Sequence, residues 1–567
     1  MIGLFKPWIL GLLAMLSIAF CRRQMTAWIG EIRRSIGALA QEIKNEYRDK
    51  QAVYIGALIM ISIALAITFA IASHAPAVYR DDLSYHLYLP KAYLEMGRIA
   101  PVPFHQAQSY YPHLFNISYI PALAFGGELA AKMMNFCWSL VLAGLGICLA
   151  LRAGASALTA CTAGAAVLAT PLVGEMSQTA LADLPAACFA LGGLLALLAY
   201  QNKTPAPVAI LSALALNKYT SWSFPLATAM IFAWQTRNNA RFLFRGVFQF
   251  ALFSMTALLP LCAYLWWTMG SPFYPLPFLN GFPYDSLEKA NLAATTINRN
   301  PAMLLSYCWE RFLSGGGLDG GAYLAFCPLI LLWPDLLKGK TGRIALWLAL
   351  ALAIRFFAGG QSQLIWRYIL PVYAAGAVLG ILVWGRALGE WPKRRWMLRL
   401  MLAAQLIVPG LTAMAMSALP QAFYNAGRLS GSDFLDRYYP NEGWEMLLTV
   451  NHLPPQSRTA VIDHHATPYH YKDLGRHLWQ VPHEILLQDD PLRIAEALKR
   501  EQITHVLFIH SQWERTRTPN GVLWNAVYFA PYIQCRWWTN KRLDFLKSVS
   551  WTWGAVLFKI EPAIGRL

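Results

Sequence analysis

The chain has 567 residues, of which 56% are hydrophobic and only 14% are charged, yet its formal net charge is +17. So few charged residues cannot cover the surface of one water-soluble globule of this length. The basic excess does not indicate nucleic-acid binding, because the basic residues stand in short connections between apolar segments and form no soluble patch. Composition therefore predicts a membrane protein.

The first 50 residues predict an N-terminal anchor followed by a cytoplasmic amphipathic segment. Residues 1–21 are apolar and are followed by Arg22 and Arg23, a pattern that fits an uncleaved anchor, a short span or an interfacial helix. The basic residues up to position 50 follow an amphipathic pattern, which is typical of a helix lying on the cytoplasmic membrane surface. Whether residues 1–21 cross the bilayer is left open by the sequence.

Residues 51–419 predict a transmembrane domain, because apolar segments long enough to cross roughly 30 Å of hydrocarbon recur there. Alternate connections are rich in Lys and Arg, which places those connections in the cytoplasm. Residues 208–234 are predicted to form two short helices hinged near Tyr219, since a single crossing would put the arginines at 237–245 outside. About 11 to 12 transmembrane helices are expected, the main ones at residues 53–73, 129–151, 157–173, 179–200, 208–218, 222–234, 247–269, 323–333, 344–358, 368–384 and 397–419.

The same alternation places two long loops, residues 74–128 and 270–321, and the whole tail, residues 420–567, on the outer side. The tail has strand-like stretches at 459–462 and 505–509 with a helical pattern at 491–501 between them, which predicts a small extracytoplasmic α/β domain. Neither the nine cysteines nor four histidines of the tail have the spacing of a standard metal site. We therefore expect no metal; the histidines are His464, His465, His470 and His477.

The first outer loop contains adjacent acids, Asp81 and Asp82, followed by Tyr85 and His86. Two neighbouring carboxylates at a membrane surface are costly unless they are solvated, paired or used. Asp82 alone could cap a helix predicted over residues 83–96. A cap needs only one carboxylate and leaves His86 unexplained, so the loop is a candidate functional site.

Further charged residues are predicted at the same membrane face. Asp183 lies at the outer end of a predicted span, where it could act in catalysis or cap the helix with Pro185 in its first turn. Lys218 lies in the hinge near Tyr219, and Arg367 lies at the outer start of a span; for each, snorkelling of the charge to the interface is the simpler interpretation. Lys132 is a weaker candidate for the same face.

Such acids and cations suit the displacement of a phosphate from a sugar carbon. A carboxylate can deprotonate the attacking acceptor, and Lys or Arg can stabilise the anionic leaving group. The departing phosphate is a weak base, so no carboxylic acid has to protonate it. Direct displacement from one face would invert the anomeric configuration.

The motifs occur in one order between residues 54 and 371, and each of them alone is short. They are Asp81-Asp82, Tyr85-His86, Pro90-Lys91, Tyr111-Pro112, Ala131-Lys132, Ala182-Asp183-Leu184-Pro185, Leu216-Asn217-Lys218-Tyr219, Gly270-Ser271-Pro272 and Arg367-Tyr368-Ile369-Leu370-Pro371. In this order and on this side of the membrane they resemble the GT-C superfamily of polyprenyl-phosphate-sugar-dependent glycosyltransferases. That group contains protein O-mannosyltransferases and lipid A aminoarabinose transferases.

The resemblance implies roles for particular residues. Asp81 would be the general base, and Asp82 and Asp183 would orient the acceptor. Asp82 stands where many members have Glu, which leaves its role open because its reach is one methylene shorter. No cofactor or metal is implied. The residues that would contact substrate are Tyr85, His86, Lys132, Lys218, Tyr219, Arg367 and Tyr368, with Lys132, Lys218 and Arg367 at the donor phosphate.

The sequence thus predicts an inverting glycosyltransferase in a bacterial inner membrane, with its C-terminal domain in the periplasm. Its expected partners are a polyprenyl-phosphate-linked sugar, membrane lipid and an unidentified envelope acceptor, which is a lipid, glycan or protein. Two other interpretations stay open: a transporter or lipid-linked-sugar flippase, in which membrane charges mark a translocation path, and a non-catalytic assembly protein whose outer domain binds a partner.

Overall fold

The computed structural model describes most of the helical part of the chain and part of the tail. Residues 1–50, the outer loop 270–321 and the four histidines of the tail lie outside this description, except for isolated positions before residue 50. The described ranges are 52–77, 81–100, 114–200, 205–237, 240–269, 330–358, 366–391, 406–412, 452–462, 478–480, 490–509, 546–552 and 555–560, with shorter stretches and isolated positions elsewhere.

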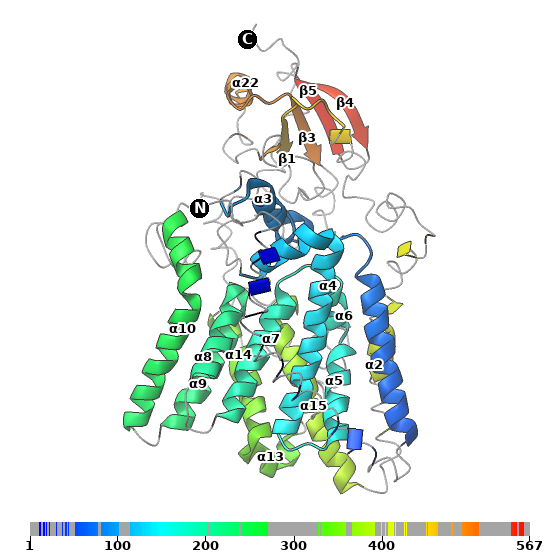
Figure 1. Ribbon diagram of the computed structural model, residues 1–567, viewed down its shortest axis with the longest axis vertical. Helices are drawn as coiled ribbons and strands as arrows, with labels where there is room; N and C mark the ends of the chain where they lie inside the picture. Colours follow the sequence, from blue (N-terminus) through cyan, green and yellow to red (C-terminus); the bar gives the residue numbers. More distant parts are fainter. Residues whose placement is uncertain are drawn as a thin grey trace.

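Long helices run side by side along the longest axis of the molecule, and a small sheet stands beyond one end of them (Figure 1). Helix α3 (Tyr88–Met96) lies at that same end, between the long helices and the sheet. The helices of this bundle, which include the short α6 and α8, are α2 (Ala52–Ala72), α4 (Leu114–Arg152), α5 (Ala157–Leu168), α6 (Pro171–Ser177), α7 (Asp183–Ala199), α8 (Ala206–Leu214), α9 (Ser223–Thr236), α10 (Ala240–Met269), α14 (Lys340–Ala358) and α15 (Leu370–Glu390).

The surface of these helices confirms the membrane class. On α10, Phe248 is 62% exposed and Trp267 is 83% exposed, and both belong to a largely apolar segment. Water would penalise so large an apolar surface, whereas lipid chains solvate it. Among the described residues, three helices are long and apolar enough to cross a bilayer, and the bent pair α5 and α6 would make a fourth. The larger number of spans expected from the sequence stays a prediction.

Helix α4 contains a break near the residue at which the sequence predicted a span to begin, residue 129. Gly127 has φ 61° and ψ −155°, which is not helical, so two helices meet there. A residue without Cβ adopts this conformation at little steric cost. The break separates residues 114–126, at the end of the molecule near α3, from the long apolar part that follows.

Close packing between α7 and α8 brings the start of α7 to the end of α8. A Cβ on Gly193 of α7 would lie 2.4 Å from the Ser212 Oγ of α8, so the glycine allows the two backbones to approach closely. Helix α8 ends at Leu214 and is followed by two short 3-10 turns before α9 begins at Ser223. The predicted break near Tyr219 is therefore confirmed.

The tail contains a five-stranded mixed sheet of order β2-β1-β3-β5-β4. Strand β1 is parallel to β2 and β3, whereas β5 is antiparallel to β3 and β4. The strands predicted at 459–462 and 505–509 and the helix predicted between them are present; the outer position of the tail stays a prediction. The elements are β1 (Thr459–Ile462), β2 (Leu478–Gln480), α22 (Pro491–Arg500), β3 (His505–Ile509), β4 (Leu546–Thr552) and β5 (Ala555–Ile560).

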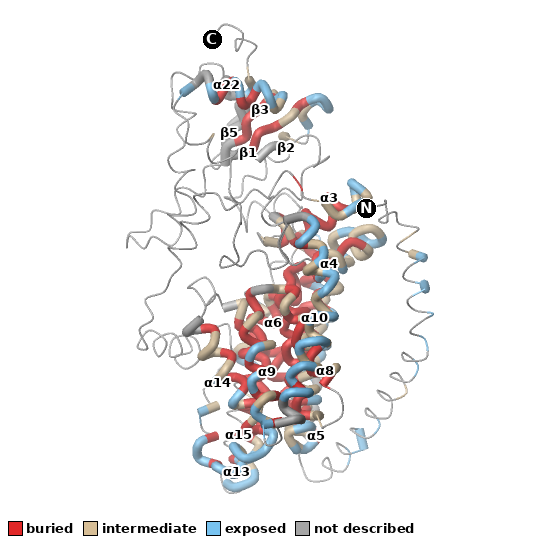
Figure 2. The backbone as a smooth tube through the Cα atoms, turned by 90° about the vertical axis from the view of Figure 1, so that its left-hand side faces the viewer, coloured by how far each residue is buried: buried red, intermediate tan, exposed pale blue. Residues whose placement is uncertain are grey.

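The two faces of the sheet have different neighbours. Val461 and Leu507 are register partners and belong to the same buried apolar cluster as Leu83 and Leu87, which both precede α3. Helix α22 lies on the side of the sheet away from α3 (Figure 2). The sheet therefore contributes side chains to the apolar cluster that packs around Leu83 and Leu87 of the first outer loop.

Candidate functional site

The first outer loop enters the site through a wide, π-helical turn. Asp81 precedes a π-helical turn (Asp82–His86), which continues into α3, so the single helix predicted over residues 83–96 is interrupted at Leu87. Leu83 and Leu87 are fully buried in the apolar cluster shared with the sheet. This burial fixes the orientation of the turn and leaves the Asp81 side chain 21% exposed.

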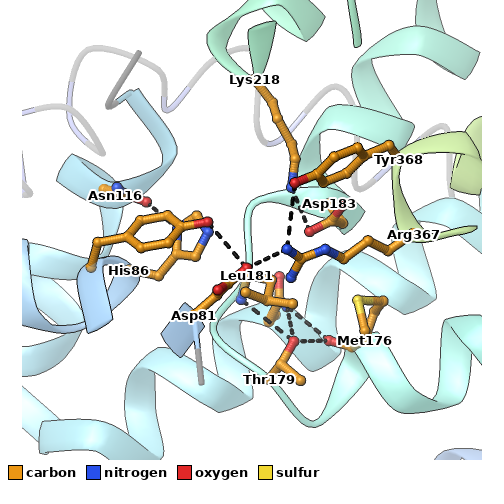
Figure 3. Close-up of polar contacts among 12 residues, drawn as sticks. Asp81, His86, Asn116, Met176, Thr179, Leu181, Asp183, Lys218, Arg367 and Tyr368 are labelled. Carbon is orange, nitrogen blue, oxygen red and sulfur yellow. Dashed lines mark hydrogen bonds and ion pairs between the residues drawn. The ribbon is translucent and has the colours of Figure 1, made fainter. Parts of the chain in front are cut away.

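Two ion pairs form the centre of the site (Figure 3). Lys218 Nζ lies 2.6 Å from Asp183 Oδ2, and the Arg367 guanidinium pairs with Asp81 Oδ2. The four side chains come from four separate segments of the chain, and all are mostly buried. The sequence analysis identified all four, and the structure brings them together.

The contacts at Asp183 replace the simple capping interpretation. Helix α7 has no side-chain cap hydrogen bond at its start, and the Asp183 carboxylate instead pairs with Lys218. Its side chain is only 1% exposed. Snorkelling does not describe Lys218 or Arg367 either, since each charge is directed at a carboxylate and not at solvent.

Tyr368 connects the two pairs. Its ring centroid lies 5.1 Å from Lys218 Nζ and 5.2 Å from the guanidinium carbon of Arg367, within the range of cation–π attraction. The Tyr85 hydroxyl donates a hydrogen bond to Asp81 Oδ2 at 3.2 Å. Two cations at one aromatic ring, each paired with an acid, form a compact site for an anionic group.

Asp81 and Asp82 are neighbours with opposite electrostatic environments. Burial alone would raise the pKa of Asp81, but the charge and hydrogen bond of Arg367, together with the charges of His86 and Lys218, outweigh it, so the pKa of this carboxyl is lowered. Burial raises the pKa of Asp82, and a hydrogen bond from a backbone N–H offsets this only in part. Environments that separate the pKa values of adjacent acids give those acids different roles.

Asp82 belongs to neither ion pair and holds the backbone before α7. Its Oδ2 accepts a hydrogen bond from the Ala180 N–H at 2.9 Å. The cap position of its turn is Asp81, which makes no side-chain capping hydrogen bond. The side chain is fully buried. These contacts favour a positioning role for Asp82 over the direct contact with acceptor that the resemblance implied.

The sequence analysis missed a set of buried polar side chains that hold the same backbone segment. Met176 and Ser177 end α6, and residues 178–182 connect it to α7 and so carry Asp183. Only the general cost of a polar group within an apolar helix could have indicated these side chains. The Tyr119 hydroxyl donates to the Leu181 carbonyl at 3.0 Å, the Asn135 amide to the Met176 carbonyl at 2.9 Å, and the Ser73 hydroxyl to the Ser177 carbonyl at 3.2 Å.

Lys132 has a different environment from the expected one. Its ammonium donates to the carbonyls of Ala75 and Pro76, and the residue is 2% exposed. Glu128, one turn earlier, accepts a hydrogen bond from the Ala77 N–H. Lys132 therefore secures the segment that follows α2 and does not join the cations around Tyr368.

The remaining predicted residues are His86 and Tyr219. His86 Nδ1 lies 2.7 Å from Asn116 Oδ1, and its ring contacts that of Tyr85 at a centroid distance of 4.2 Å. The backbone of Tyr219 lies in the turn after Lys218, and its side chain is outside the described atoms. Within the described ranges, no three His, Cys, Asp or Glu side chains are placed to hold a metal ion.

Fold and site together define a helical membrane protein with a charged cluster at the end of the bundle that faces the sheet. No protein-family model matches the sequence, and no curated protein matches it. Solved structures do. ArnT from Cupriavidus metallidurans in the apo state has a TM-score of 0.53 and 12% identity over 89% of this chain and 98% of ArnT.

Two further structures have similar scores. ArnT bound to undecaprenyl phosphate has a TM-score of 0.51 and 13% identity over 90% of this chain and 98% of ArnT. The oligosaccharyltransferase AglB from Archaeoglobus fulgidus, in complex with an inhibitory peptide and a dolichol-phosphate, has a TM-score of 0.52 and 11% identity over 88% of this chain and 73% of AglB. Both are GT-C glycosyltransferases, so the expected GT-C resemblance is confirmed as a likeness of fold.

Proposed function

We propose that this protein is a glycosyltransferase that moves a sugar from a polyprenyl-phosphate carrier to an envelope acceptor at the outer face of a bacterial inner membrane. The convergence of Lys218 and Arg367 on the Tyr368 ring supports this proposal most directly. Two structures of the same fold hold undecaprenyl phosphate and dolichol-phosphate, which fits a lipid-linked phosphate as the anionic ligand.

The chemistry assigned to the site is a single displacement. A nucleophilic atom of the acceptor forms a bond to the anomeric carbon while the bond from that carbon to the phosphate oxygen breaks. The acceptor proton passes to Asp81, and the polyprenyl phosphate leaves as an anion stabilised by Lys218 and Arg367. Attack opposite the leaving phosphate inverts the anomeric configuration.

Binding of the donor couples the two ion pairs to this chemistry. In the empty site each cation is already paired with a carboxylate. An arriving phosphate competes with these carboxylates for Lys218 and Arg367. Once Arg367 turns to the phosphate, Asp81 loses the charge that lowers its pKa. Asp81 is therefore a stronger base when the donor is bound than when the site is empty.

The test is transfer by the purified full-length protein in lipid nanodiscs, supplied with polyprenyl-phosphate sugars and an envelope extract as acceptor. Loss of a general base lowers rates by about 10²-fold to 10⁴-fold. We expect Asp81→Asn to lower the transfer rate by about 100-fold or more, and product analysis reports inversion.

Asp335→Asn is a matched control for this charge change. Asp335 pairs with Arg386 at 3.2 Å near the opposite end of α15 from Arg367, and its side chain is 59% exposed. We expect this variant to transfer sugar at the wild-type rate. Equal rates for Asp81→Asn and wild type would reject Asp81 as the base. Movement of lipid-linked sugar across vesicles without any glycosidic product would reject the transferase in favour of a flippase.

A further inference from the structure

Several buried acceptor atoms at the site have no hydrogen-bond partner among the described residues. They are His86 Nε2, Asp82 Oδ1 and Asp183 Oδ1. Buried polar atoms in proteins are nearly always satisfied, so each exception calls for an explanation. A ligand that donates hydrogen bonds would satisfy such atoms.

The contact with Asn116 determines the protonation of His86. Nδ1 lies 2.7 Å from the amide oxygen Oδ1, which can only accept, so the ring proton is on Nδ1. Nε2 then carries a lone pair. Burial, together with the charge of Lys218, lowers the pKa of His86 to about 3, so the ring is neutral at physiological pH.

His86 belongs to the charged cluster by position as well as by sequence. The residue is 5% exposed, and its ring lies against that of Tyr85, whose hydroxyl donates to Asp81. The charges of Asp81, Asp183 and Lys218 all act on the ring. Figure 3 shows the ring between Asn116 and Asp81, with Asn116 on the side away from Arg367 and Lys218.

We propose that His86 is a specificity-determining residue that accepts, through Nε2, a hydrogen bond from a substrate hydroxyl, while Asn116 fixes the tautomer that makes this possible. The proposal rests on the proposed function and adds the chemistry of recognition. A site built to pair with a hydroxyl strongly rejects an analogue that lacks it, because the buried acceptor is then left unpaired. The hydroxyl belongs either to the donor sugar or to the acceptor.

The first arm of the test measures lipid binding to the full-length protein in nanodiscs. One probe is bare undecaprenyl phosphate. The other, called the loaded lipid, is undecaprenyl phosphate carrying either mannose or glucose, whichever wild type binds more tightly. His86→Phe keeps a ring of similar size and removes the acceptor. We expect it to weaken binding of the loaded lipid by about tenfold, equivalent to about 1.4 kcal/mol, and to leave binding of the bare lipid unchanged. Arg367→Gln, in contrast, should weaken both.

The second arm identifies the source of the hydroxyl. If it belongs to the acceptor, His86→Phe leaves both lipid affinities unchanged and raises the KM for the envelope extract, with kcat retained. Equal weakening of bare and loaded lipid would indicate a general disturbance of the site and overturn the proposal. No change in affinity and no change in KM would also overturn it.

Variants of Asn116 provide an independent readout, the tautomer of the His86 ring, which would not change if Asn116 were only structural. In nitrogen NMR spectra, a ring nitrogen with a proton is resolved from one without, and subtraction of the His86→Phe spectrum isolates His86. We expect an unprotonated Nε2 in wild type and in Asn116→Asp, which keeps an acceptor at Nδ1, and a mixture of tautomers in Asn116→Leu. A protonated Nε2 in wild type would contradict the proposal. A wild type that binds neither bare nor loaded undecaprenyl phosphate would instead contradict the proposed function itself.

Discussion

At the scale of single residues, the site consists of charges that already neutralise one another. Asp81 with Arg367 and Asp183 with Lys218 leave little net charge around Tyr368. Mostly buried ion pairs are costly to separate unless a new partner replaces the old one. A phosphate is such a partner, since it accepts several charge-assisted hydrogen bonds. Ligand affinity therefore depends on how strongly the protein's own carboxylates hold the cations.

This competition gives a prediction that separates binding from catalysis. Asp81→Asn removes the carboxylate that competes for Arg367, so the inactive variant should bind undecaprenyl phosphate more tightly than wild type, by about tenfold for each 1.4 kcal/mol of competition relieved. The measurement is the dissociation constant of the bare lipid in nanodiscs. Arg367→Gln should shift it in the opposite direction, and Asp335→Asn should leave it unchanged. Weaker binding by Asp81→Asn would show that Asp81 does not compete with the phosphate.

The residue types explain which parts of the site could be predicted from sequence. Asp81, Asp183, Lys218 and Arg367 could be found because charges in apolar surroundings are costly and rarely incidental. Their pairing could not be predicted, because it depends on segments far apart in the chain that the fold brings together. Lys132 has the same sequence signal, yet its partners are backbone carbonyls, which no sequence pattern marks.

At the scale of elements, the segment between α6 and α7 is the structural support of the site. It is held from two directions, by Asp82 in the first outer loop and by Tyr119 and Asn135 of α4. These contacts set the start of α7 and hence the position of Asp183. The charge pattern predicted the break between α8 and α9, because turns have to alternate between the two sides of the membrane. The buried hydrogen bonds have no such periodic signal and were missed.

Asp82 allows this supporting role to be tested against a catalytic one. Asp82→Asn keeps an oxygen that can accept from the Ala180 N–H, and burial raises the pKa of the native carboxyl, so a neutral side chain suits the position. We expect Asp82→Asn to retain most transfer activity. Asp82→Ala leaves a buried N–H unpaired, which costs about 1–3 kcal/mol of stability, and it should lose activity in parallel. Transfer rates and thermal unfolding of both variants are the measurements.

Wild type and Asp82→Asn should also differ in how their stability depends on pH. Because the folded pKa of Asp82 is raised above the unfolded value, the folded state holds the proton more tightly, and its stability falls as pH rises from the unfolded pKa through the folded one. Asp82→Asn has no such group and should lose this part of the pH dependence. If Asp82→Asn were as inactive as Asp81→Asn, a catalytic role for Asp82 would replace the supporting one.

At the scale of the whole molecule, the sheet and the loop that carries Asp81 share one apolar cluster. Val461 and Leu507 point from the sheet into the cluster that contains Leu83 and Leu87, close to Asp81. Sequence periodicity could predict the strands, but not the partner of each face. A shift of the sheet would therefore reach the turn after Asp81 through this shared cluster.

Adjacent residues of β3 provide a matched pair to test this coupling. Val506 and Leu507 are both buried, and strand geometry directs them to opposite faces of the sheet. Leu507→Ala should cost about 2–5 kcal/mol and loosen the shared apolar cluster. Hydrogen exchange at residues 83–96 of the full-length protein should then accelerate, and the KM for the acceptor extract should rise. Val506→Ala weakens the same strand from its other face and should leave exchange in α3 unchanged. Equal acceleration in both variants would mean that the sheet acts on α3 only through its overall stability, and unchanged exchange in both would mean that the two are not coupled.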